Sequence, residues 1–455
     1  MRSTSKALPE EAPSDSILRE DRQLGIITGE LVRRGYGLGR RGRGRSVASL
    51  PIALPFVFLT CGGAGVGEPD PGAARVASVE IMPGATLIVG EGGEASFSAV
   101  ARTESGATVS GASARFEWSV EDPAVATLTS GSSAMAVARG GAPGVTRVVA
   151  AVDGVRGEAR LEVFVPEEVS RYEPGRRYLG RNGYVEYIPG DMGIILSAAH
   201  GGAILPAEIP DREGGTHVTD TNTRELTLAM RDALFELTGR TPHVIISHLV
   251  RAKLDPNREI VEAAEGNPYA EQAWREFQGW IETARTTVAE DFGTGLYLDI
   301  HGHGHAIDRL ELGYLIGRDD LDLPDAALDR AEVIARTSIR TLGETSSLPF
   351  SQLLRGATSL GGLLEAEEVP SVPSPADPSP GDAPYFRGGY NTREHGSLLA
   401  GEMVSGIQIE HHYRGVRDTD GNQRDYAARA ARALRRFMLE HYGEHYAGIG
   451  GTSPP

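Results

Sequence analysis

The most constraining feature of the sequence is an alternation of strand-like and helix-like segments between residues 171 and 448. Short apolar runs typical of buried strands lie at residues 192–198, 243–246, 296–300, 312–316 and 407–410. Segments with the apolar spacing of helices lie at residues 223–238, 271–290, 326–342 and 425–442. This alternation predicts an α/β fold, a three-layer sandwich around a mostly parallel or mixed sheet.

Three of the strand-like runs end in a side chain that can bind a metal or move a proton. These side chains are His200, His301 and Glu410, each placed at or just after the last residue of its run. Functional sites collect at the carboxyl ends of strands in sheets of this kind. We therefore expect the three side chains to meet in one site.

The run that precedes His301 continues as Asp-Ile-His-Gly-His-Gly-His, with His301, His303 and His305 at every second position. In a strand, this spacing places the three imidazoles on one face. Imidazole is the commonest metal ligand in proteins, and Asp299 lies where a carboxylate can orient a ring. The segment predicts a metal site, with a polar strand end that carries solvated histidines as the alternative.

A fourth stretch, residues 248–259, concentrates positive charge, because Arg251, Lys253 and Arg258 fall within a dozen residues. The planar fork of an arginine guanidinium binds a carboxylate through two hydrogen bonds. We interpret the stretch as an anion-binding loop. A solvated charged loop is the alternative interpretation.

The composition limits the partners, the disulfides and the membrane-spanning helices that the chain can have. The formal net charge of -17 argues against nucleic acid, since phosphate binding requires a basic face. One cysteine allows no intramolecular disulfide. No apolar run reaches the length of a membrane-spanning helix.

Residues 1–61 have the layout of an export signal. Six arginines between residues 33 and 45 precede an apolar run at residues 47–59, and the only cysteine, Cys61, lies just after that run. The pattern resembles a bacterial lipoprotein signal, in which the cysteine is lipidated and becomes the mature N-terminus. We expect export to the cell envelope with a lipid anchor at Cys61. The alternative is a disordered basic tail with a short buried helix.

Residues 62–74 have the composition of a linker, and residues 75–166 carry short alternating runs separated by turn signals. This pattern predicts an all-β sandwich. Its motifs resemble the bacterial Ig-like family of type 2: Val-Glu-Ile-Met-Pro at residues 79–83, Phe-Glu-Trp-Ser at 116–119 and Asp-Pro-Ala-Val-Ala at 122–126. We expect Trp118 to anchor the core and the module to space another domain or to bind a surface partner.

Six short motifs in residues 170–450 resemble, in the same order, those of the N-formylglutamate amidohydrolase family, which is distantly similar to zinc carboxypeptidases. They are Ser-Ala-Ala-His-Gly-Gly at residues 197–202, Asp-Thr-Asn-Thr at 220–223, Arg251 with Asp-Pro-Asn-Arg at 255–258, Asp-Ile-His-Gly at 299–302, Phe-Arg-Gly-Gly-Tyr at 386–390 and Gly-Ile-Gln-Ile-Glu at 406–410. The chain departs from the family at Asn222, Pro256 and Gly302, where Asp, Leu and Ser are usual.

The resemblance implies a phosphorylase/hydrolase-like fold and a Zn²⁺-dependent hydrolase of amide bonds. His200, His301 and Asp220 are the implied metal ligands, and Glu208 competes with Asp220 for the third position. Glu410 is the implied general base, which takes a proton from the attacking water and passes it to the leaving amine. The implied substrate-binding residues are Arg251, Asn257 and Arg258, which hold a carboxylate, and Arg387 and Tyr390, which add transition-state hydrogen bonds.

We therefore expect an exported, lipid-anchored hydrolase whose small-molecule or peptide substrate carries a free carboxylate, as N-formyl and other N-acyl amino acids do. Formylglutamate itself is not expected, because its hydrolysis belongs to cytoplasmic histidine breakdown. A carboxypeptidase or cell-wall peptide amidase of the same fold is one alternative. A catalytically inactive protein that binds carboxylated ligands or a surface glycan is another.

Overall fold

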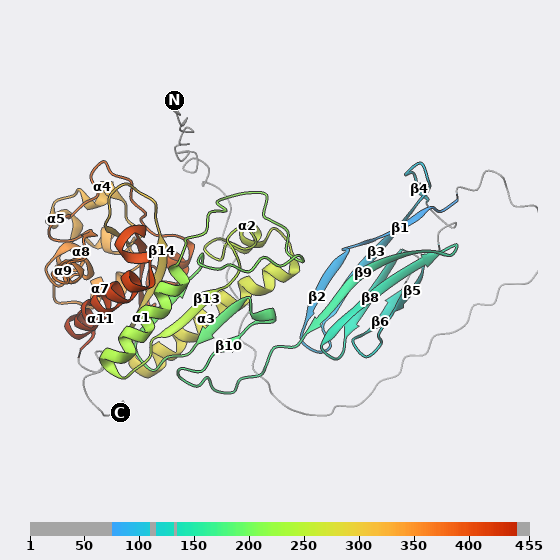
Figure 1. Ribbon diagram of the computed structural model, residues 1–455, viewed down its shortest axis with the longest axis horizontal. Coiled ribbons are helices and arrows are strands. Elements are labelled where there is room, and N and C mark those ends of the chain that lie inside the picture. Colours follow the sequence, from blue (N-terminus) through green and yellow to red (C-terminus); the bar gives the residue numbers. More distant parts are fainter. Residues whose placement is uncertain (1–74, 110–114, 132–133, 444–455) are drawn as a thin grey trace, which may run out of the picture. The chain divides into compact units, whose positions relative to one another are not determined.

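The structure, a computed structural model, describes residues 75–109, 115–131 and 134–443 (Figure 1). The expected export signal, Cys61 and the linker up to residue 74 lie outside these described residues. None of the helices in the described part of the chain combines the length and the apolar character needed to cross a membrane.

The described elements between residues 78 and 164 are all strands, and they form two sheets. In the first sheet the order is β1 (Ser78–Met82), β3 (Glu94–Arg102), β7 (Met135–Gly140) and β6 (Ala126–Gly131), with β4 (Thr108–Val109) beside β3. In the second sheet the order is β2 (Ala85–Val89), β9 (Val155–Phe164), β8 (Gly144–Val152) and β5 (Glu117–Val120). Phe97 of the first sheet and Leu161 of the second share one buried core, against which Trp118 packs. The two sheets therefore pack face to face.

The remaining part of the chain is built around a single eight-stranded sheet. Its strand order is β10 (Tyr178–Leu179), β11 (Val185–Ile188), β13 (His243–Ser247), β12 (Ile194–Ala198), β14 (Gly295–Gly302), β17 (Val404–His411), β15 (Leu310–Gly313) and β16 (Ser371–Val372). The four central strands, from β13 to β17, run parallel to one another. Strands β11 and β15 run antiparallel to their central neighbours, so the sheet is mixed.

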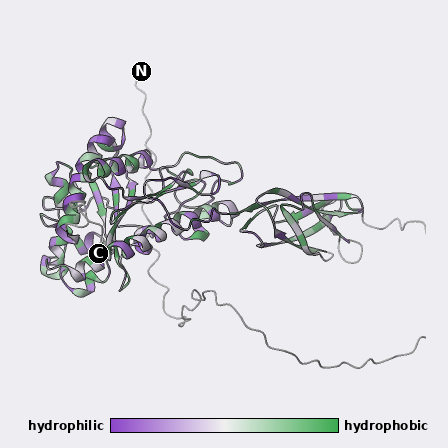
Figure 2. Cartoon of the chain, turned by 90° about the horizontal axis from the view of Figure 1, so that it is seen from below, coloured by the Kyte–Doolittle hydropathy of each residue, from purple (hydrophilic) through white to green (hydrophobic). Residues whose placement is uncertain are grey.

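Helices cover both faces of this sheet. On one face, α1 (Thr223–Thr238) and α11 (Asp420–Tyr442) share a buried core with Leu196 and Leu298 of the central strands (Figure 1). On the other face, α3 (Pro268–Phe292) packs with the alternate strand residue Tyr297. Figure 2 shows the helices as mixtures of hydrophilic and hydrophobic residues, as expected of helices that pack against a sheet on one side. The predicted α/β fold around a mixed sheet is confirmed.

The expected helix at residues 326–342 is wrong. The structure has three short helices there, α5 (Asp325–Leu328), α6 (Ala331–Ile334) and α7 (Arg340–Thr345). Between α6 and α7 the chain leaves the helical path at the buried residue Ser338, whose backbone carbonyl accepts hydrogen bonds from the backbone N–H groups of Ser397 and Gly406. These tertiary hydrogen bonds replace intrahelical ones, and no periodic pattern reveals them.

The other described helices are short and connect the strands. They are η2 (Arg181–Gly183), α2 (Ile260–Ala264), α4 (Arg318–Leu321), α8 (Phe350–Arg355), α9 (Leu360–Ala366), α10 (Tyr390–His395) and the π-helical turn η3 (Tyr413–Arg417). The expected strand at residues 312–316 is observed four residues long as β15, and the chain turns at Leu315, which has a left-handed φ of 68°.

Candidate metal centre

Three central strands deliver side chains to one edge of the sheet, as the sequence predicts. His200 lies two residues after β12, His301 is the second-last residue of β14 and Glu410 is the second-last residue of β17. His301 and Glu410 are Cα partners in the register of β14 and β17, so their side chains leave the same face of the sheet. The rings of His200 and His301 are 4.8 Å apart between centroids.

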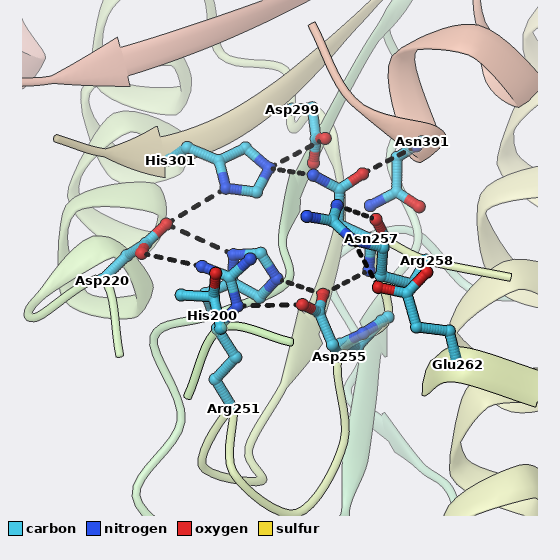
Figure 3. Close-up of polar contacts among 12 residues, drawn as sticks. His200, Asp220, Arg251, Asp255, Asn257, Arg258, Glu262, Asp299, His301 and Asn391 are labelled. Carbon is cyan, nitrogen blue, oxygen red and sulfur yellow. Dashed lines mark hydrogen bonds and ion pairs between the residues drawn. The ribbon is translucent and has the colours of Figure 1, made fainter. Parts of the chain in front are cut away.

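Asp220 joins the two imidazoles (Figure 3). Its Oδ2 atom lies 3.3 Å from Nδ1 of His200 and 3.1 Å from Nδ1 of His301. The same oxygen accepts a hydrogen bond from the backbone N–H of Gly302 at 3.2 Å. One atom from each of the three side chains falls within 4.8 Å of the others, which is the spacing of a group able to hold a metal ion.

The far nitrogen of each imidazole is held by a second carboxylate (Figure 3). Nε2 of His200 lies 2.6 Å from Oδ1 of Asp255, and Nε2 of His301 lies 2.9 Å from Oδ2 of Asp299. A carboxylate accepts a hydrogen bond from a ring N–H, so Nε2 of each ring carries a proton and Nδ1 faces Asp220. Two oriented Nδ1 atoms and one carboxylate oxygen are the donor set of a His₂-carboxylate zinc site, so these residues fit the ion.

The charges around this group are arranged to hold a cation. Burial lowers the pKa of His301, but the carboxylates of Asp299 and Asp220 raise it further, and the net pKa lies well above the usual value. Burial opposes ionisation of Asp220, yet the two imidazoles bring its pKa below the usual range. In the metal-free protein a proton on His301 therefore carries the positive charge that the carboxylates require.

Glu410 is buried beside this group and has a different environment. Burial raises the pKa of Glu410 to about 8, and His301 counteracts this while Asp220, Glu311 and Asp299 add to it. One carboxylate oxygen accepts a hydrogen bond from Nε2 of Gln408 at 2.9 Å. A carboxyl group whose pKa lies near neutrality is suited to exchange protons with a substrate.

The structure adds one residue that the sequence did not indicate, Arg417. Its guanidinium donates to three backbone carbonyls, those of Thr221, His303 and, at 3.0 Å, His411. Each carbonyl lies one or two residues after a member of the site, namely Asp220, His301 and Glu410. Arg417 therefore ties together the three segments that carry the site residues.

Two departures from the amidohydrolase motifs meet at Arg417. A Cβ atom on Gly302 would lie 2.4 Å from Cζ of Arg417, so any other residue here would displace the guanidinium. Asn222 has a left-handed φ of 67° and donates from Nδ2 to the Arg417 carbonyl at 2.7 Å. Asparagine tolerates this φ, and an aspartate carboxylate has no proton to donate.

The predicted anion-binding loop lies against the group formed by His200, Asp220 and His301, called the metal group below. Arg251 donates from Nε to Asp255 at 2.9 Å, and its Nη1 lies 3.8 Å from Asp220 (Figure 3). Arg258 has about a third of its side chain exposed and donates from Nε to Glu262 at 3.1 Å. The Nδ2 atom of Asn257 lies 3.3 Å from Nε2 of His301. The loop thus brings two arginines and an amide to the site.

The Phe-Arg-Gly-Gly-Tyr motif borders the same loop. The backbone N–H of Asn391 donates to Oδ1 of Asn257 at 2.8 Å, and a Cβ atom on Gly389 would collide with the Asn257 amide. Arg387 is exposed, and the half-buried Tyr390 lies with its ring centre 6.2 Å from that of Trp274. Both residues belong to the same motif as Gly389, which contacts Asn257, and among the described residues they have no hydrogen bond to His200, Asp220 or His301.

The competing ligand Glu208 lies elsewhere. It accepts hydrogen bonds from Arg181 at 2.7 Å and from the hydroxyl of Tyr184 at 2.8 Å. Asp220 therefore occupies the position next to the two histidines. Asp255 belongs to the Asp-Pro-Asn-Arg motif at residues 255–258. Its contact with His200 joins residues 55 apart, and no local signal predicts that contact.

Comparison with known proteins gives limited matches. No family model matches the chain, and no curated protein does. Among solved structures, the N-formylglutamate amidohydrolase from Ralstonia eutropha JMP134 is 12% identical with a TM-score of 0.34, covering 55% of this chain and 97% of that one. A gene product from Agrobacterium tumefaciens is 13% identical with a TM-score of 0.34, covering 56% of this chain and 95% of that one.

Another group of matches covers a smaller part of the chain. Domains 4 and 5 of the S-layer protein SbsC are 15% identical with a TM-score of 0.17, and the match covers 20% of this chain. The chain spans about half the length of that fragment, 52%. At these TM-scores the likenesses do not decide function, which is inferred from the site.

Proposed function

We propose that the α/β part of the chain is a zinc-dependent hydrolase that cleaves an amide bond in a substrate with a free carboxylate. The observation that carries the proposal is the pair of imidazoles, each oriented by its own carboxylate, with both Nδ1 atoms facing Asp220 beside a buried Glu410. A structural ion pair does not require two outer carboxylates and a neighbouring carboxyl group with a raised pKa.

Each residue has a role that follows from its place. An amide is a poor electrophile, and a zinc ion held by His200, Asp220 and His301 would polarise its carbonyl and lower the pKa of water. Glu410 accepts a proton from the attacking water and donates it to the leaving amine. Burial of Glu410 keeps its pKa near the working pH.

The carboxylate of the substrate is assigned to the loop beside the metal group. Arg258 is the first candidate because its guanidinium is partly exposed and its partner Glu262 is more exposed still. In the metal-free protein Arg251 donates from Nε to Asp255, so this nitrogen is already engaged. Asn257 carries the amide nearest His301, and Arg387 and Tyr390 remain proposed contacts for the transition state.

The proposal is tested by measuring zinc content and activity together in the full chain. The wild type should bind zinc and hydrolyse N-formyl or other N-acyl amino acids, or short peptides, and C-terminal amides of the same compounds should react poorly. Glu410→Gln should keep its zinc and lose about 100-fold or more in kcat. A near-normal rate in that variant would remove Glu410 from the mechanism.

Two alternatives give different results in the same experiments. A carboxypeptidase or cell-wall peptide amidase would prefer peptides to N-acyl amino acids. A ligand-binding protein without activity would bind carboxylated compounds and hydrolyse none of them. The two imidazole–carboxylate pairs favour catalysis, because a binding protein needs only the arginines.

We also propose that the protein is exported and held in the cell envelope by a lipid on Cys61, with the all-β part as an Ig-like spacer or surface-binding module. The proposal rests on the arginine-rich segment, the apolar run and the single cysteine. Cys61→Ser should move the protein from the membrane fraction to the soluble fraction. Unchanged membrane recovery would refute lipid anchoring.

A further inference from the structure

A second cluster of metal-ligand side chains lies on the other side of Glu410. His303, His305 and Glu311 each offer one ligand atom within 4.8 Å of the others. Glu410 on β17 is the Cα partner of His301 on the neighbouring strand β14 and of Glu311 on the other neighbouring strand, β15. The catalytic carboxyl group therefore lies between two clusters of imidazoles and carboxylates.

The contacts of this cluster leave one nitrogen of His303 directed at its neighbours. Nε2 of His303 lies 2.8 Å from the backbone carbonyl of Arg309, so it carries the proton. Among the described residues, the one hydrogen bond that Nδ1 of His303 accepts comes from the backbone N–H of His305, at 3.1 Å. As in the first group, an outer acceptor fixes the ring, and a cation on Nδ1 of His303 would replace the hydrogen bond from the backbone N–H of His305.

Glu311 has the environment of a metal-binding carboxylate. It is 1% exposed, and it accepts hydrogen bonds from Nδ1 of His305 at 2.7 Å and from the backbone N–H of Phe386 at 2.8 Å. Within the described part of the chain, His305 is its only partner at ion-pair distance, and no arginine or lysine reaches it. A buried carboxylate beside a second one, Glu410, lacks a compensating positive charge.

An ion can reach the cluster from solvent. The side chain of His305 is 22% exposed, whereas His303 is buried. The His305 ring stacks on Phe386 with centroids 4.8 Å apart, which holds the ring in place at the opening. A third imidazole, His412, has its ring centre 6.4 Å from that of His303, and its Nδ1 has no hydrogen-bond partner in the described residues.

We propose that His303, His305 and Glu311 form a second divalent-cation site, separate from the His200, Asp220 and His301 group. Two imidazoles and one carboxylate select a borderline transition-metal ion such as Zn²⁺ over Ca²⁺ or Mg²⁺, which prefer oxygen ligands. The ion supplies the positive charge that Glu311 lacks. Both ions then border Glu410, one from each neighbouring strand.

The test measures bound zinc per full-length chain after dialysis, by elemental analysis, with no need for a substrate. The wild type should hold two equivalents, and Glu311→Gln and His305→Asn should each hold one. The matched control His217→Ala, which changes an exposed histidine outside both groups, should keep two. Circular dichroism confirms that each variant is folded.

A double variant separates this proposal from the proposed function. His200→Ala should lose the first ion and keep one equivalent, and adding Glu311→Gln to His200→Ala should remove the remaining ion. If the wild type holds one equivalent and Glu311→Gln still holds one, the cluster is only a hydrogen-bonded wall and the second site is refuted. If zinc is lost with Glu311→Gln and not with His200→Ala, the second site stands and the first group fails.

Discussion

Glu410→Gln should change how the stability of the metal-free protein depends on pH. Glu410 is buried, and its pKa rises from 4.5 in the unfolded chain to about 8 in the folded chain. Between these two values the folded state holds a proton that the unfolded state has released. The free energy of unfolding must therefore fall as pH rises through this window.

The magnitude follows from the size of the shift. One bound proton corresponds to about 1.4 kcal/mol per pH unit, so the full window amounts to about 5 kcal/mol. Between pH 5.5 and 7.5 the difference is about 3 kcal/mol. Glutamine does not titrate, so Glu410→Gln should lose this slope and become more stable than the wild type by a margin that grows with pH.

The assay is urea unfolding of the chelator-treated protein at several pH values, followed by tryptophan fluorescence, to which Trp274 and Trp280 on α3 contribute. Glu236→Gln, a change at an exposed carboxyl group on α1, should leave the slope unchanged. Saturating zinc should shrink the difference between Glu410→Gln and the wild type, since a nearby cation favours the ionised carboxylate. Parallel pH profiles for the two metal-free proteins would refute the reasoning.

Three further predictions concern the metal group. His301→Ala should abolish both zinc binding at the first group and activity. An unchanged zinc content in this variant would show that His301 is not a zinc ligand. Zinc affinity should fall up to about tenfold per pH unit below the raised pKa of His301, because the ion must displace a proton; a calorimetric titration that shows no proton release would contradict this. Arg417→Met should weaken zinc binding and lower kcat by removing the hydrogen bonds that tie together the carbonyls of Thr221, His303 and His411, and loss of the donor to the buried His303 carbonyl alone should cost about 1–3 kcal/mol. Gly302→Ala should act in the same direction by displacing the guanidinium. Unchanged zinc affinity in both variants would show that Arg417 is not needed to position the ligands.

The sequence by itself determined the frame of the site. Apolar runs that end at His200, His301 and Glu410 are local patterns, and parallel strands necessarily bring their carboxyl ends to one edge of the sheet. The role of Asp299 also followed from local spacing, because it lies two residues before His301 on the same strand face.

Only the tertiary structure decided which atoms meet. Asp255 reaches His200 across 55 residues, and Arg417 reaches the segment of Asp220 across 196. Such contacts depend on how loops fold over the sheet edge, and loop paths leave no periodic signal in the sequence. The pairing of Glu311 with Glu410 also joins residues about a hundred apart in the chain, and the register of β15 with β17 fixes it.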